Sequence, residues 1–188
     1  PVKDLLGNAG QLCIIPDSYL YSIPFQSLQN PDNKRFLIED YAIYYSYSLS
    51  MLKQLKEQVK SKDDEIIAFG NPYFGETGVA TPKQVFASLP KSEQEVKNIA
   101  GIYGDKSIVL LQKEASETNF KQNAKKYDIV HIATHGLLDE VNPMFSSLLL
   151  ASDSIQDGFL SAREIITLDM NSSLVILSAC ETAKGKIS

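Results

Sequence analysis

Short runs of apolar residues alternate with amphipathic stretches along most of the chain, a pattern typical of strands in a sheet covered by helices. Continuous apolar runs predict strands that are buried on both faces. We expect them at 11–16, 19–28, from 41, and at 65–72, 107–112, 127–134, 146–151 and 173–179. Helical periodicity predicts helices up to 58 and at 92–104, 116–127 and 161–168.

Two of the expected helices carry start signals in the sequence. Ser92 and Glu95 have the spacing of a capping box, and Ser116 stands before the first turn of the next helix. A loop rich in Gly, Thr and Pro fills the chain from 73 to about 90. The pattern as a whole predicts an α/β fold with a mostly parallel central sheet flanked by helices.

Composition narrows the class of protein. The 188 residues, 44% hydrophobic and 22% charged, suit one globular domain over 1–188. A formal net charge of -5 argues against direct nucleic-acid contact. No apolar run approaches the roughly 20 residues of a membrane helix, so we expect no membrane contact. Two cysteines are too few for a disulfide framework, so we expect a cytoplasmic protein. A start at Pro1 suggests an excised portion of a longer chain.

Two expected strands are followed at once by a reactive side chain. The run from Ile129 to Thr134 leads into His135 and Gly136, and the run from 174 to 179 leads into Cys180. Since the carboxyl ends of parallel strands form the ligand crevice of an open α/β sheet, neighbouring strands would bring the imidazole and the thiol together. A thiolate is a competent nucleophile, and a histidine serves as its acid and base. The backbone N–H groups of Gly136 and Cys180 are candidates for an oxyanion hole.

These residues also carry a resemblance to a known family. "HIATHG", "DGFLSAREI" and "LVILSACETAKG" resemble the CHAT domain, a caspase-like peptidase domain associated with tetratricopeptide repeats. The similarity extends through "LYSIPFQSL", "AFGNP", "LPKSEQEVKNIAGIYG" and "NPMFSSLLLA". It implies a caspase-like three-layer sandwich with His135 and Cys180 as the catalytic pair. Their separation, 180 minus 135 or 45 residues, is close to the roughly 50 of caspases.

Other assignments of the same residues are weaker. His131 lies four residues before His135, about 13 Å along a strand, so we assign it a buried structural role. No metal is expected, because the segment that holds both histidines favours a strand, the residues between them lack the Glu of a zinc-protease helix, and no third ligand is spaced nearby. Ser178 lacks the glycines of a nucleophile elbow. Cys13 is assigned to the core.

Three functions are considered for a chain that carries this pair of residues. The leading hypothesis is a cysteine endopeptidase that cleaves protein or peptide substrates and requires no cofactor. The alternatives are a non-catalytic caspase-like interaction or signalling module, and an acyltransferase or amidase that forms the same thioester. By resemblance, the partners would be a tetratricopeptide-repeat region or another regulatory protein.

The family pattern continues past "SACETAKG" into further strands. The eight residues after Cys180 are too few for another parallel strand with its crossover, which takes a dozen or more residues. We therefore expect the C-terminal part of the fold to be missing, a further C-terminal segment to complete the sheet, and little activity without it.

Overall fold

The computed structural model describes residues 6–58, 64–75, 80–81 and 84–180. Within it the chain divides into two compact units, Pro1–Val59 and Lys60–Ser188. The first unit is called unit 1 and the second unit 2. The single domain expected over 1–188 stays a prediction.

Unit 1 is built on two short parallel strands. Strand β1 (Gln11–Ile14) pairs with β2 (Ala42–Tyr45), and the described part of the unit also contains helices α2 (Leu37–Asp40) and α3 (Leu49–Gln58). The strand and the following helix expected over 41–58 are confirmed.

The strand expected over 19–28 is wrong. The chain forms two short 3₁₀ helices there, at Ser18–Ser22 and Phe25–Ser27. Their backbone bonds join residues three apart, as in the bond from Ile23 N–H to the Leu20 carbonyl. An apolar run shows that a segment packs against something but does not by itself distinguish a strand from a helix.

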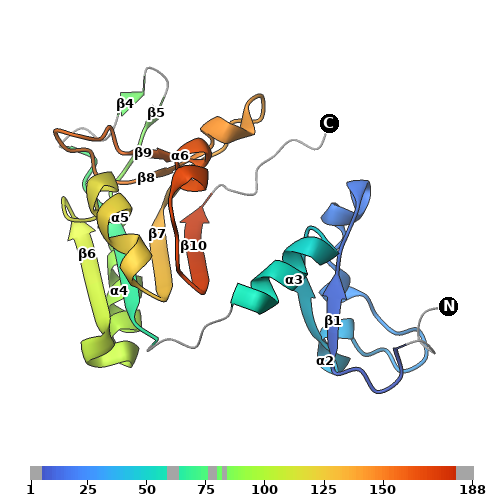
Figure 1. The fold of residues 1–188 in the computed structure, drawn as a ribbon. Coiled ribbons are helices and arrows are strands. Elements are labelled where there is room, and N and C mark those ends of the chain that lie inside the picture. Colours follow the sequence, from blue (N-terminus) through green and yellow to red (C-terminus); the bar gives the residue numbers. More distant parts are fainter. Residues whose placement is uncertain (1–5, 59–63, 76–79, 82–83, 181–188) are drawn as a thin grey trace. The chain divides into compact units, whose positions relative to one another are not determined.

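A six-stranded sheet forms the centre of unit 2 (Figure 1). Its strands in chain order are β3 (Ile66–Pro72), β6 (Ser107–Gln112), β7 (Ile129–Leu137), β8 (Ser147–Leu149), β9 (Phe159–Ser161) and β10 (Leu174–Cys180). Strands β6, β3, β7 and β10 lie side by side in that order and are all parallel. Strands β8 and β9 continue from the end of β7 in antiparallel pairing.

The sheet is therefore mixed, which corrects the expectation of a mostly parallel sheet. The connections 138–146 and 150–158 are shorter than the dozen or more residues that a parallel crossover requires, so β8 and β9 can only turn back on the strand before them. Strand β9 was not predicted from the sequence, because three residues give no periodicity.

Helices cover both faces of this sheet and make three layers. Helix α4 (Pro90–Tyr103) packs on one face, where Val96 contacts Ala68 and Ala133. Helices α5 (Glu117–Asn123) and α6 (Ala162–Thr167) lie on the other face. The small antiparallel pair β4 (Ala80–Thr81) and β5 (Gln84–Val85) stands between β3 and α4 in the chain.

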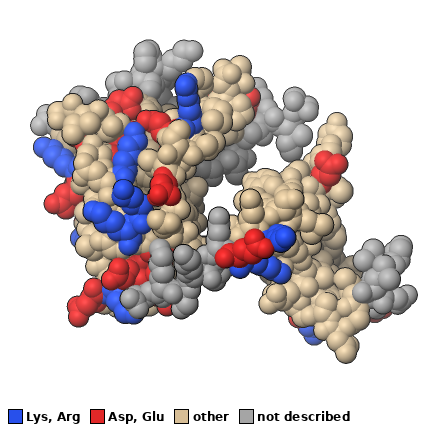
Figure 2. Space-filling model, viewed as in Figure 1, with Lys and Arg blue, Asp and Glu red and all other residues tan. Residues whose placement is uncertain are grey.

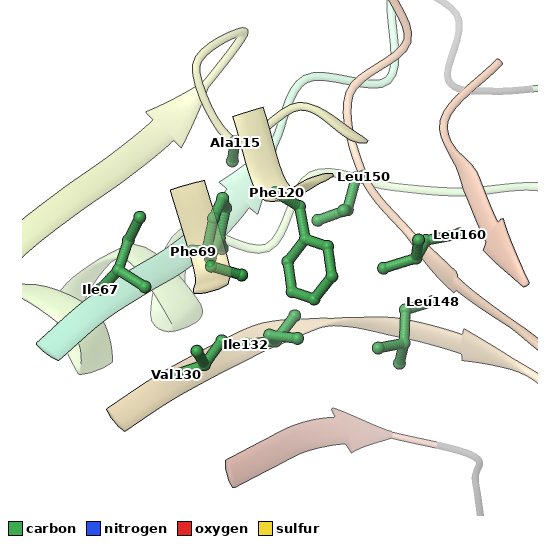
Figure 3. Close-up of a cluster of buried hydrophobic side chains, with 10 residues drawn as sticks. Ile67, Phe69, Ala115, Phe120, Val130, Ile132, Leu148, Leu150 and Leu160 are labelled. Carbon is green, nitrogen blue, oxygen red and sulfur yellow. The ribbon is translucent and has the colours of Figure 1, made fainter. Parts of the chain in front are cut away.

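The main core lies between the sheet and α5. The ring of Phe120 enters a cluster of strand side chains and lies 5.5 Å from the ring of Phe69, centroid to centroid. Figure 3 shows Ile132, Leu148 and Leu160 around the same ring. Burial of a side chain of this size contributes about 1.5–3 kcal/mol to folding.

The two predicted helix starts have different outcomes. Ser116 caps α5, since its hydroxyl accepts the backbone N–H of Asn119, as predicted. The capping box at Ser92 is wrong, because α4 begins earlier, with Pro90 in its first turn. Ser92 makes a different contact, in which its hydroxyl oxygen accepts a hydrogen bond from the backbone N–H of Asn71.

Charges of both signs are interspersed on the face shown in Figure 2, where lysines and arginines lie among acidic side chains. This agrees with the small net charge of -5. Within the described residues, no helix has the length and apolar character needed to cross a membrane.

The close contact between β3 and α4 depends on Gly70. A Cβ at this position would lie 2.7 Å from Cγ2 of Val96 and 2.9 Å from the carbonyl oxygen of Ser92. We expect Gly70→Ala to push α4 away from the sheet and to lower the free energy of unfolding by about 1–3 kcal/mol, as overpacking does. Denaturant unfolding followed by circular dichroism measures the change.

Gly101 in α4 is the matched control. No atom lies within 4 Å of a Cβ built there, and alanine favours a helix interior. Gly101→Ala should leave stability unchanged or raise it by about 0.5–1 kcal/mol. An equal loss in both variants would contradict the close approach at Gly70.

Candidate functional site

His135 and Cys180 lie at facing positions on neighbouring parallel strands. The pairing of β10 with β7 begins at Leu174 opposite Ile129 and runs without a shift to Cys180 opposite His135. The sequence placed both residues just after their strands, whereas the structure places them inside. Strand β7 continues to Leu137, and Cys180 is the last residue of β10. The side chain of Cys180 lies outside the described part of the structure.

The imidazole of His135 is held by three residues of the β3–α4 connection. Its ring centroid lies 5.7 Å from that of Phe74 and 5.4 Å from that of Phe86. Its Nε2 is 2.9 Å from the backbone carbonyl oxygen of Ala87. Because a carbonyl can only accept, Nε2 carries the proton of this bond, and in the neutral ring Nδ1 keeps a lone pair.

Gly136 stands where the pairing of β7 changes direction. It is buried and lies opposite Leu148 of the antiparallel strand β8. Thr134 strengthens this junction, because its buried hydroxyl donates a hydrogen bond to the carbonyl of Leu149. The turn from parallel to antiparallel pairing thus occurs directly beside His135.

An apolar cavity of about 170 Å³ lies beside Gly136. Strands β7 to β10 and helix α6 contribute its lining, which is Gly136, Leu137, Leu138, Ser146, Ser147, Leu148, Leu160, Ala162, Ile165 and Leu177. A larger cavity of about 540 Å³ lies within unit 1 among Pro16, Tyr21, Ser22, Ile23, Pro24, Gln26, Tyr45, Ser46 and Tyr47. Neither cavity includes His135 or Cys180. The smaller one is lined by Leu148, Leu160 and Ile165 of the main core, on the α5 and α6 side of the sheet, whereas His135 faces the other side.

Glu95 joins the two strands two residues before Cys180. One carboxylate oxygen lies 2.8 Å from Nε2 of His131, and the other accepts the hydroxyl of Ser178 at 3.2 Å. The carboxylate stands between the imidazole and the hydroxyl, so these groups are not arranged as a hydrolytic triad, in which the histidine is central. The sequence assigned Glu95 to a helix cap and missed this contact, which joins residues 83 positions apart.

His131 itself is buried, as predicted, with 4% of its surface exposed. Its Nδ1 is buried and has no hydrogen-bond partner among the described residues. Cys13 of β1 is a free thiol, and it differs from its assignment to the core because it is only partly buried.

A second polar cluster fixes helix α6 on the far side of the sheet. Lys121 lies 2.8 Å from Glu164 and 2.6 Å from Glu117, which is fully buried. The hydrogen bond from Lys121, followed by that from Ser161, lowers the pKa of Glu164 to about 2. This cluster stabilises the fold and contains no residue of the candidate pair.

Among the described residues, no group of three or more His, Cys, Asp or Glu side chains is arranged to hold a metal ion.

The contact between His131 and Glu95 gives a prediction about stability. We expect His131→Asn to lower the free energy of unfolding by about 1–3 kcal/mol. The shorter asparagine side chain does not reach the Glu95 carboxylate, so its own amide is left buried without that partner. Ser178→Ala should cost less, because Ser178 is exposed. Thermal unfolding of the two variants measures the difference. A large loss of activity in His131→Asn at an unchanged melting temperature would refute the structural role.

Comparison with known proteins identifies the family of the chain. A search of curated proteins found no match. The profile of the CHAT domain matches residues 1–188, the whole chain. CHAT is a family related to caspase-like cysteine peptidases, and the mixed α/β sheet flanked by helices is consistent with that fold. The match over its full length shows that the chain belongs to the CHAT domain family.

Proposed function

We propose that this protein is a caspase-like cysteine peptidase that cleaves peptide bonds in protein substrates. The observation that carries the proposal is the register of β7 and β10, which sets His135 opposite Cys180. Residues in register on neighbouring strands face the same side of a sheet, which favours a common position for the thiol and the imidazole. Membership of the CHAT family supports the same chemistry.

His135 acts through its Nδ1 in this proposal. The bond from Nε2–H to the Ala87 carbonyl leaves the Nδ1 lone pair available for the thiol proton of Cys180. The thiolate attacks the substrate carbonyl carbon, and the proton passes from His135 to the leaving amine as the C–N bond breaks. Water then hydrolyses the thioester with His135 as base, which restores the thiol.

The oxyanion of each tetrahedral intermediate needs hydrogen-bond donors. We assign this role to the backbone N–H groups of Gly136 and Cys180, as the sequence suggested. The absence of a Cβ at Gly136 allows close approach of a substrate.

Strand β10 needs a covering partner. Leu174, Val175, Ile176 and Leu177 are successive and all exposed, between 37% and 55% of their surface. Among the described strands, β10 pairs with β7 alone. Successive apolar residues suit a strand covered on both faces, and an open apolar edge is a template for pairing. We propose that a further segment, supplied by the parent polypeptide, pairs with β10 and completes the substrate groove.

The remaining proposals rest on composition and family. A tetratricopeptide-repeat region or another regulatory protein is the proposed partner, and the cytoplasm is the proposed location. The alternative function is a non-catalytic interaction module, which the exposed edge of β10 would also serve.

Replacement of either member of the pair tests the peptidase proposal. We expect Cys180→Ala and His135→Ala each to abolish cleavage of a peptide library by the complete parent protein, with non-additive losses, since the two residues act as one unit. An acyloxymethyl ketone peptide should label Cys180 in the wild-type protein.

Cys13→Ala is the matched control, because Cys13 is a free cysteine in unit 1. It should retain both cleavage and labelling. Wild-type turnover in Cys180→Ala would refute the assignment. Absence of both labelling and turnover in the parent protein would favour the interaction module.

The covering of β10 gives a separate prediction. We expect residues 1–188 alone to have little activity and to self-associate, because the apolar edge is open. Supply of the segment that covers β10, fused or in trans, should raise activity and give a monodisperse species in light scattering. Full activity of the isolated chain as a monomer would contradict the need for a cover.

A further inference from the structure

Asn71 occupies an unusual position at the C-terminal end of β3. Its backbone is left-handed, with φ of 45°, and only 3% of its surface is exposed. Asparagine tolerates this conformation better than most residues, although glycine tolerates it best. The backbone alone therefore does not explain why a buried amide stands here.

The side chain of Asn71 binds the segment that leads into α4. Its Oδ1 accepts hydrogen bonds from the hydroxyl of Ser88 and from the backbone N–H of Leu89, both at 2.8 Å. Its Nδ2 donates to the carboxylate of Glu93 at 3.0 Å. The pKa of Glu93 is lowered by the hydrogen bond from Lys97 and then by that from Asn71. One amide thus fixes both ends of residues 88–93.

The residues just before this segment hold His135. Ala87 provides the carbonyl that accepts Nε2–H, at 2.9 Å, and Phe86 packs against the ring. Ala87 is bonded directly to Ser88, so the orientation of its carbonyl depends on how Ser88 and Leu89 are fixed. The peptide bond between Ala87 and Ser88 therefore links the segment that Asn71 binds to the carbonyl that holds His135.

We infer that Asn71 is a positioning residue that sets the tautomer of His135 through the carbonyl of Ala87. The inference deepens the proposed function and rests on it for its effect on catalysis. Without a fixed acceptor at Nε2, the neutral imidazole populates both tautomers and loses its orientation. Only the tautomer with its proton on Nε2 presents a lone pair at Nδ1 to the thiol, so loss of the acceptor removes part of the competent population.

A purely structural role for Asn71 makes a different prediction. A buried amide needs hydrogen-bond partners in any case, and its loss would lower stability. In that case the tautomer of His135 would not change in the folded protein. The state of the imidazole thus separates the two roles.

The chain of residues 1–188, with the segment that covers β10 supplied in trans without isotope label, is well suited to this measurement, because the chain contains two histidines. Long-range ¹H–¹⁵N NMR spectra distinguish the two tautomers of each ring, and His131→Asn assigns the signals. In the wild type we expect His135 to carry its proton on Nε2. In Asn71→Gly, which keeps the left-handed backbone and removes only the amide, we expect averaged signals of both tautomers.

Two further variants control the result. Asn119→Ala removes another amide, which lies on α5 and donates to the backbone carbonyl of Glu114, and this variant should leave His135 unchanged. Asn71→Asp alone places two carboxylates against each other at Glu93. Asn71→Asp combined with Glu93→Gln exchanges acceptor and donor and keeps the net charge, so we expect it to restore the wild-type tautomer.

Turnover of the complete parent protein gives the catalytic readout. By analogy with other residues that orient a histidine, Asn71→Gly should lower kcat about 10- to 100-fold with little change in KM. The combined variant should recover most of this loss. If Asn71→Gly does not fold, Ser88→Ala removes one of the same hydrogen bonds and should give a partial shift of the tautomer.

The outcomes separate this inference from the proposed function. An unchanged Nε2–H tautomer in folded Asn71→Gly would overturn the inference while the peptidase proposal stands. Mixed tautomers in Asn71→Gly, together with a parent protein that cleaves no peptide, would support the positioning role and refute the peptidase.

Discussion

The parallel pairing of β7 with β10 is the constraint on which the candidate site depends. Seven residues of each strand are in register, and the last pair is His135 and Cys180. Because the side-chain period of a strand is two, a slip by one residue would turn one member of the pair to the opposite face. The apolar residues of β7 specify the register, since each face of that strand is packed against different helices.

Successive side chains of β7 point to opposite faces of the sheet, and the two faces have different contacts. Val130 and Ile132 point to the α5 side and join the main core. His131, Ala133 and His135 occupy the alternate positions, and their contacts lie with α4 or with the connection that precedes it. Helix α4 therefore supports the polar side of the strand, through Glu95 near the middle and through the segment before its first turn near the end.

Buried polar groups recur on both faces of β7 and at the end of β3, and most are satisfied by partners far away in the sequence. Asn71 binds residues 88–93, Glu95 binds His131, and Thr134 binds Leu149. Each bond joins two different elements, and an unsatisfied buried partner costs about 1–3 kcal/mol. Such contacts make the positions of β3, β7, β8 and α4 interdependent, so His135 is held by the fold as a whole.

The sequence alone determined the regular elements and the residues that carry the candidate chemistry. The spacing of apolar residues located most strands and helices of unit 2, because the burial of one or both faces of an element decides which of its positions are apolar. The reactive side chains at the ends of two expected strands, and then the resemblance to the CHAT family, both pointed to His135 and Cys180. The stretches that carry the resemblance run along most of the chain, in agreement with the family match over residues 1–188.

Only the tertiary structure decided how these parts meet. It fixed the antiparallel direction of β8 and β9, replaced an expected strand by 3₁₀ helices, and moved Ser92 and Glu95 from a helix cap to contacts with β3, β7 and β10. The roles of Asn71, Phe74 and Ala87 around His135 had no sequence signal either. Local patterns record whether a residue is buried, whereas the partner of a buried polar group is set by segments that the fold brings together from distant parts of the chain.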